Sequence, residues 1–148
     1  RRVDLIDWSA LPDGARVLLD TAPIIYVLEG HPLADRFAGL FERIAEGDIR
    51  AIVTPVTVAE VVGGPLKRGR QGLAERYRLA LTAAPGWSLR ALDGDLAMLA
   101  ARLRAEHGLR LPDAIQLATA ISECCDALVT HDRDFPSTAG VRVMGPPD

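Results

Sequence analysis

The sequence predicts an α/β protein in which a parallel sheet carries helices on both faces. Short apolar runs alternate with amphipathic helical patterns along the 148 residues, and this alternation is typical of strands joined by crossover helices. The apolar runs are continuous rather than alternating with polar residues, which indicates strands buried on both faces. Hydrophobic residues make up 49% of the chain, enough for one domain with a substantial core.

Five segments are predicted to be strands. The first ends in three apolar residues that run directly into Asp20 and Thr21, and the rest of the chain is organised around this point. The others are similarly short and are bounded by turn-forming residues or by helical patterns. The predicted strands cover residues 16–19, 51–53, 88–92, 127–130 and 141–143.

Helical patterns lie between these strands. The clearest covers 33–45, where apolar residues recur at helical spacing before Gly47 ends the pattern. Pro55 occupies a first-turn position, and Asp93 is expected to cap the helix 94–107. Further helices are predicted at 22–28, from 55, at 73–81 and from 111, and 63–72 is expected to be a flexible basic loop. Residues 1–15 are interpreted as an amino-terminal arm that Trp8 attaches to a single domain, 16–148.

Composition narrows the functional classes. The formal net charge of −3 argues against a protein that coats nucleic acid through its overall charge, although it permits a local basic patch. No apolar run approaches the roughly 18 residues that span a membrane, and no segment resembles a secretory signal. The neighbouring cysteines Cys124 and Cys125 are unsuited to a disulfide with each other, so both are expected to be reduced in a cytoplasmic protein.

Four acidic residues stand at strand ends or in small-residue helical turns: Asp20, Glu60, Asp113 and Asp132. Asp20 and Asp132 each follow a buried strand. Because the carboxyl ends of parallel strands meet at one edge of a sheet, both are expected where open α/β sheets bind ligands. Glu60 lies in the helix after the second strand, and Asp113 in the first turn of a later helix. The sequence therefore predicts that four carboxylates meet.

Clustered carboxylates repel one another, so such a site calls for a cation between them. Oxygen ligands without a set of Cys or His favour Mg²⁺ or Mn²⁺. The expected chemistry is attack of water on a phosphodiester, because the cation lowers the pKa of the water and offsets charge on the phosphorus oxygens. Asp134 is a further candidate ligand or a turn cap, and the Thr130 hydroxyl is expected to support the site by bonding a carboxylate.

Each acid also has an ordinary structural interpretation. Asp20 alone would cap the helix that follows it, and Asp113 alone would complement the dipole at a helix start. Glu60 would lie at the edge of an apolar stripe, and Asp132 would form an Asx-turn. The choice between these interpretations depends on whether the acids meet.

The segments that carry these acids resemble the motifs of a known family. They are Leu18-Leu19-Asp20-Thr21 with Ile25-Tyr26, Thr57-Val58-Ala59-Glu60-Val61, Leu111-Pro112-Asp113-Ala114 with Ala118-Thr119-Ala120, and Val129-Thr130-His131-Asp132-Arg133-Asp134-Phe135. In this order and spacing they resemble a PIN domain, and more closely the VapC-type toxin ribonucleases of bacterial toxin–antitoxin pairs. The resemblance covers residues 16–144.

The resemblance implies a three-layer α/β/α fold with a central parallel sheet of about five strands in the order 3-2-1-4-5. It implies an endoribonuclease that depends on Mg²⁺ or Mn²⁺ and cuts single-stranded RNA. Asp20 and Asp113 would ligate the metal directly, whereas Glu60 and Asp132 would complete the site and position water, with Thr21 in support. The family also implies a homodimer and an antitoxin whose tail blocks the site, often with an Arg that reaches the carboxylates.

RNA binding is assigned to a local basic patch, since the whole chain is mildly acidic. The candidates are Lys67, Arg68 and Arg70, with Arg76 and Arg78 next. Equally, these residues are what an ordinary solvated loop and helix face would carry.

Three other functions are alternatives to the toxin. A non-catalytic RNA- or protein-binding module on the same fold need not retain four mutually repelling carboxylates. A phospho-acceptor receiver domain normally has a Lys late in the chain, whereas the single Lys here, Lys67, lies in the middle. The third alternative is a related RNA-processing or DNA-cleaving nuclease. The sequence does not separate this function from that of the toxin.

Overall fold

The computed structural model describes residues 6–131, 135–136 and 140–146 of the chain. Five short strands form its sheet, and six α-helices and two 3₁₀ helices connect or flank them. The strands are β1 (Ala15–Leu19), β2 (Ile49–Val53), β3 (Trp87–Leu89), β4 (Ala127–Val129) and β5 (Arg142–Met144). The helices are η1 (Trp8–Ala10), α1 (Thr21–Glu29), η2 (Pro32–Arg36), α2 (Ala38–Ala45), α3 (Pro55–Lys67), α4 (Gln71–Thr82), α5 (Gly94–His107) and α6 (Leu111–Ser122).

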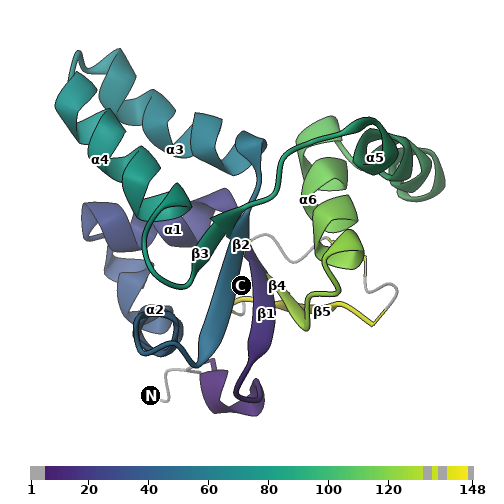
Figure 1. The fold of residues 1–148 in the computed structure, drawn as a ribbon, viewed down its shortest axis with the longest axis horizontal. Coiled ribbons are helices and arrows are strands. Elements are labelled where there is room, and N and C mark those ends of the chain that lie inside the picture. The colour runs from purple at the N-terminus through teal and green to yellow at the C-terminus, as the bar shows by residue number, and fades with distance from the viewer. Residues whose placement is uncertain (1–5, 132–134, 137–139, 147–148) are drawn as a thin grey trace.

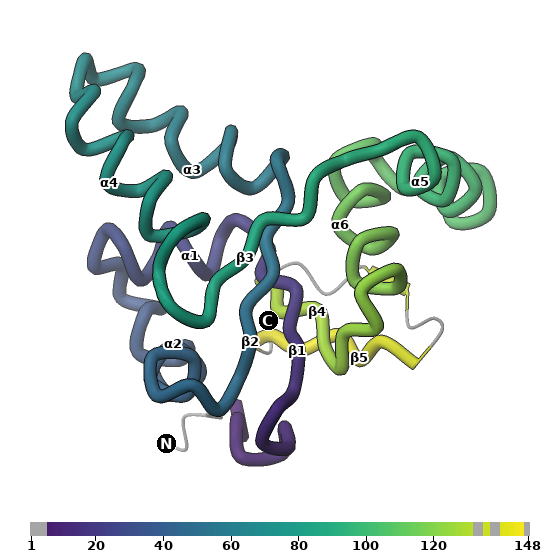
Figure 2. The backbone as a smooth tube through the Cα atoms, in the orientation of Figure 1, coloured from purple at the N-terminus to yellow at the C-terminus, as the bar shows by residue number. Residues whose placement is uncertain are grey.

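The sheet is parallel throughout and has the order β3-β2-β1-β4-β5. This arrangement confirms the predicted α/β class and the strand order 3-2-1-4-5. The helices α1 to α4 lie on one side of the sheet, and α5 and α6 lie on the other (Figure 1). The same path is visible in the backbone trace, where β1 runs through the middle of the molecule (Figure 2).

Strand β1 shows why both faces of the sheet need helices. Val17 and Leu19 pack into the core under α1, α2, α3 and α4, whereas Leu18 packs into the core under α5 and α6. All three side chains are fully buried. A strand with large apolar side chains on both faces is stable only in the middle of a three-layer fold. The end of β1 is therefore held rigidly on both sides.

The predicted helix 33–45 is divided in the structure, so that expectation was wrong in detail. Residues Pro32–Arg36 form η2, and α2 begins only at Ala38. The indole Nε1 of Trp8 donates to the carbonyl of Arg36 at 2.9 Å. That carbonyl would otherwise accept from a residue one turn later in a continuous α-helix. Trp8 is itself buried, so η1 packs against the rest of the fold.

The segment 63–72 is not the flexible loop that its composition suggested. Helix α3 continues through Gly63, Gly64 and Pro65 to Lys67, and α4 begins after a turn of three residues. The carbonyl of Pro65 accepts from the backbone amides of both Arg68 and Arg70, which closes that turn. Pro65 is buried, and packing between helices overrides weak local helix propensity here.

Among the described residues, no helix is long and apolar enough to cross a membrane. Both cysteines are free thiols, as expected. Burial raises the pKa of Cys125 to about 12, so this thiol is a poor nucleophile near neutral pH.

Candidate active site

The site lies where β1, β2 and β4 end at one edge of the sheet. Asp20 follows β1, Thr54 follows β2 and Thr130 follows β4. The backbone amide of Asp20 donates to the carbonyl of Val129 at 2.9 Å, which continues the pairing of β1 with β4 by one residue. Open α/β sheets bind ligands at this edge.

Three donors hold the carboxylate of Asp20. Its Oδ1 accepts from the backbone amide of Thr21 at 2.9 Å and from Nε2 of Gln116 at 3.0 Å. Its Oδ2 accepts from the Thr130 hydroxyl at 2.9 Å. Asp20 is also the amino-terminal cap of α1. The two interpretations of this residue are therefore compatible, because the cap bond uses only part of the capacity of Oδ1.

Glu60 reaches the same site from α3. Its Oε1 accepts from the Thr21 hydroxyl at 2.8 Å, and Thr21 follows Asp20 in the chain. Glu60 is exposed, so it faces the opening of the site rather than the core. Thr21 thus links Glu60 of α3 to the start of α1, next to Asp20.

Asp113 comes from the first turn of α6, on the other side of the sheet. Its Oδ2 accepts from Nε of Arg110 at 3.1 Å. The Asp113 side chain is 18% exposed, whereas that of Arg110 is 79% exposed. The positively charged guanidinium of Arg110 therefore lies beside the Asp113 carboxylate.

One cavity of about 290 Å³ connects these residues. It is lined by Asp20, Thr21, Ala22, Ile25, Glu60, Arg110, Pro112, Asp113 and Gln116. The structure thus brings three of the four predicted acids to one cavity. Asp132 and Asp134 lie outside the described residues. Within the part of the chain that is described, no three His, Cys, Asp or Glu side chains lie close enough together to hold a metal ion.

Gln116 and Thr54 were not among the site residues predicted from the sequence. Gln116 is 1% exposed and links Asp20 to two threonines, Thr54 and Thr57. A signal was available, because Gln116 is a long polar side chain inside the apolar run of α6. A buried polar side chain needs partners, and a carboxylate at the neighbouring strand end is one such partner.

The predicted RNA-binding residues lie apart from the cavity of the acids. Lys67 ends α3, and Arg68 and Arg70 lie in the turn before α4. Arg68 pairs with Glu29 of α1 at 3.8 Å. None of the three lines the cavity of the acids, where the basic residue is Arg110.

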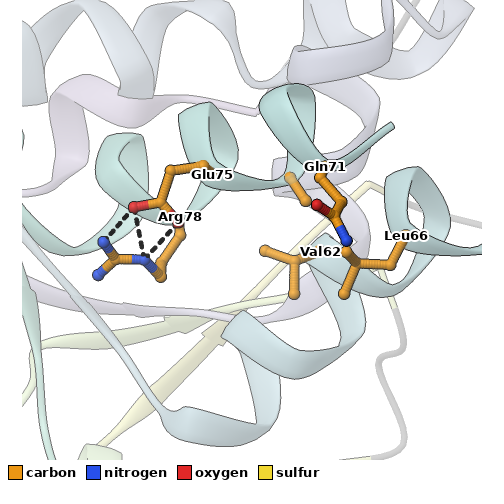
Figure 3. A pocket seen from close by; sticks show the side chains of 6 residues that line it. Val62, Leu66, Gln71, Glu75 and Arg78 are labelled. Carbon is orange, nitrogen blue, oxygen red and sulfur yellow. Dashed lines mark hydrogen bonds and ion pairs between the residues drawn. The ribbon is translucent and has the colours of Figure 1, made fainter. Parts of the chain in front are cut away.

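A second and larger cavity of about 420 Å³ lies between α3 and α4 (Figure 3). Its lining is Val62, Leu66, Gln71, Ala74, Glu75 and Arg78. Arg78 donates to Glu75, and this hydrogen bond lowers the pKa of Glu75 and raises that of Arg78. The two charges neutralise each other, and none of the residues that line this cavity is one of the predicted catalytic acids.

Comparisons with known proteins agree with this fold. The family model of the PIN domain matches residues 17–141, and no curated protein matches the chain. A chain of a toxin–antitoxin complex from Klebsiella pneumoniae is 28% identical with a TM-score of 0.66, over 84% of this chain and 94% of that one. VapBC2 from Rickettsia felis, bound to a DNA fragment from its promoter, is 17% identical with a TM-score of 0.70, over 89% and 99%.

VapC20 from Mycobacterium tuberculosis, a toxin that cleaves the sarcin-ricin loop, is 13% identical with a TM-score of 0.60, over 76% of this chain and 86% of that one. These solved structures share the fold of this chain. The match of the PIN model extends over well more than half of the 148 residues. The chain therefore belongs to the PIN domain family.

Proposed function

We propose that this PIN domain is an endoribonuclease that depends on Mg²⁺ or Mn²⁺ and acts as the toxin of a VapBC-type toxin–antitoxin pair. The observation that carries the proposal is the Asp20 carboxylate. It is held by three donors in a cavity that it shares with Glu60 and Asp113. A fixed carboxylate that shares an open cavity with other carboxylates is suited to binding a cation.

The chemistry of these donors fits a hard divalent cation, since the acids offer oxygen and the cavity is open to water. Asp20 and Asp113 would hold the cation, with Asp132 and Asp134 as proposed further ligands. A cation bound there would supply Lewis acidity, which activates water and offsets charge on a phosphodiester. Glu60, fixed by Thr21, is proposed to position the attacking water.

Arg110 is proposed to bind the phosphate of the substrate. Its guanidinium lines the cavity and is largely exposed, and only Nε is used in the bond to Asp113. The remaining N–H groups of a guanidinium are arranged to bind phosphate oxygens in pairs. Lys67, Arg68 and Arg70 are proposed to contact the RNA backbone farther from the cleavage point.

The solved relatives support the choice of substrate and partner. One is a toxin that cleaves the sarcin-ricin loop, and others are toxins in complex with antitoxins. By analogy, we propose that this chain cleaves RNA, that an antitoxin inhibits it, and that it forms a homodimer in the cytoplasm. The family and the acids support these proposals.

One observation favours a non-catalytic binding module instead. Asp113 is paired with Arg110, and Glu60 is bonded to Thr21, so the three described acids do not form a compact metal cluster. Calorimetric titration with Mn²⁺ separates the two functions. A nuclease should bind Mn²⁺ in a manner that depends on Asp20 and Asp113, whereas a binding module should show no such site.

The proposal is tested by cleavage of a panel of single-stranded and structured RNAs. The wild type and Asp20→Ala are compared in Mg²⁺, in Mn²⁺ and with a chelator, with matched DNA strands as the substrate control. We expect metal-dependent RNA cleavage that is abolished in the variant, with an unchanged circular dichroism spectrum. Cleavage by folded Asp20→Ala at the wild-type rate would rule out the assignment of the metal site.

A further inference from the structure

Gln116 is the centre of a buried polar network beneath the acids. Its Oε1 accepts from the Thr54 hydroxyl at 2.5 Å. Its Nε2 donates to the Thr57 hydroxyl at 2.7 Å and to Oδ1 of Asp20 at 3.0 Å. Gln116, Thr54 and Thr57 are each at most 1% exposed. Water therefore cannot replace these bonds without opening the core.

The neighbours of the Gln116 amide permit one orientation. If the amide were rotated by 180°, Oε1 would face the carboxylate of Asp20, and two acceptors would repel each other. In the observed orientation, Nε2 uses both of its hydrogens and the carboxylate gains a donor. Thr54 is itself fixed, because its Oγ1 accepts from the backbone amide of Thr57 as the cap of α3. The network thus restricts rotation of the Asp20 carboxylate.

The network also joins the three elements that carry the acids. Thr57 precedes Glu60 by three residues on α3, and Gln116 follows Asp113 by three residues on α6. Residues three apart lie on the same face of a helix. The Gln116–Thr57 hydrogen bond therefore joins α6 to α3, one turn away from Asp113 on α6 and one turn away from Glu60 on α3. Asp20 at the end of β1 completes the link.

We propose that Gln116 is a positioning residue that fixes Asp20 and keeps α3 and α6 in register for divalent-cation binding. This inference rests on the proposed function, because it concerns the same acids. Gln116 lines the base of the cavity and acts through Asp20, so no contact with the cation itself is invoked. Groups that orient metal ligands in this manner typically change metal affinity or activity by about 10- to 100-fold when they are replaced.

The first test compares Gln116→Leu with Thr119→Val. Both remove a buried polar group from α6, but the Thr119 hydroxyl donates to the Ile115 carbonyl of its own helix rather than to an acid. Thermal unfolding measures how far each substitution lowers the stability of the fold, and calorimetry measures the dissociation constant for Mn²⁺. We expect Gln116→Leu to weaken Mn²⁺ binding by about 10- to 100-fold, to lower kcat for RNA cleavage and to leave KM within twofold. Thr119→Val should bind Mn²⁺ as the wild type does.

A second variant covers the case in which Gln116→Leu does not fold. Thr57→Val removes only the hydroxyl and keeps the β-branched shape, so α3 should form normally. This change deletes one of the two partners of Nε2, and Mn²⁺ binding should weaken in the same direction by a smaller factor. If both variants fold, their combination should weaken binding no more than Gln116→Leu alone, because both act through one amide.

Asp20→Asn distinguishes failure of this inference from failure of the proposed function. If Asp20→Asn leaves Mn²⁺ binding unchanged, or the wild type binds no Mn²⁺, the proposed function fails. If Asp20→Asn abolishes binding while folded Gln116→Leu or Thr57→Val binds Mn²⁺ with wild-type affinity, the positioning role alone is overturned. Equal loss of affinity in Thr119→Val would also overturn it, since the effect would then be general to α6.

Discussion

Asp20 illustrates how one residue serves the fold and the site together. The same Oδ1 that caps α1 also accepts from Gln116, and Oδ2 accepts from Thr130. The carboxylate is therefore oriented before any ligand arrives. Preorganised groups of this kind bind more tightly than mobile ones, because the cost of ordering them is met during folding.

Arg110 is predicted to compete with a cation for Asp113. Since an exposed ion pair contributes about 0–1 kcal/mol, we expect Arg110→Ala to tighten Mn²⁺ binding by up to about fivefold in calorimetry. We also expect KM for RNA to rise, because a phosphate-binding donor is lost from the cavity. Arg102→Ala is the matched control, since Arg102 is exposed on α5 and does not line the cavity. An Arg110→Ala protein with unchanged Mn²⁺ affinity and unchanged KM would contradict this role.

At the scale of elements, the predicted alternation of strands and helices was confirmed, and the errors lie where contacts distant in the chain decide the local structure. The apolar spacing in 33–45 is helical throughout. The Arg36 carbonyl, however, accepts a hydrogen bond from Trp8, which lies 28 residues earlier in the chain. The residue pattern within 33–45 does not indicate that contact. The glycines and proline in 63–65 are poor helix formers, yet α3 continues through them because it packs against α4. In both places a tertiary contact overrides the local signal.

Helix α5 offers a test of capping at this scale. Asp93 accepts from the backbone amide of Leu96 at 2.9 Å, and this bond is the main cause of its lowered pKa. Because the folded pKa lies below the unfolded value of about 3.9, the charged form favours folding. Its contribution is complete above the unfolded value and is lost as the pH falls through the folded pKa.

Asp93→Ala should therefore lower the Tm by roughly 2–4 °C at pH 7, and the difference from the wild type should shrink below about pH 4. Asp93→Ser keeps a capping oxygen without a titrating group, so its Tm should lie close to that of the wild type at pH 7. Thermal unfolding between pH 2.5 and pH 7 measures both variants. A difference between Asp93→Ala and the wild type that stays constant across this range would exclude the proposed cause.

At the scale of the whole molecule, the parallel topology brings Asp20 and Thr130 to one edge of the sheet. Glu60 and Asp113 join them because α3 and α6 begin at the same edge. The sequence did not predict the link between these helices. Gln116 and its two threonines are 59 and 62 residues apart in the chain, and each alone resembles an ordinary buried polar residue.

Single-turnover RNA cleavage tests most directly the proposal that four acids form one catalytic site. Asp20→Asn, Glu60→Gln, Asp113→Asn and Asp132→Asn are compared with Glu42→Gln, an exposed acid on α2 away from the cavity. We predict that each of the four variants loses roughly two orders of magnitude in rate or more, while Glu42→Gln cleaves as the wild type does. Wild-type cleavage by folded Asp20→Asn or Asp113→Asn would contradict the proposed catalytic site.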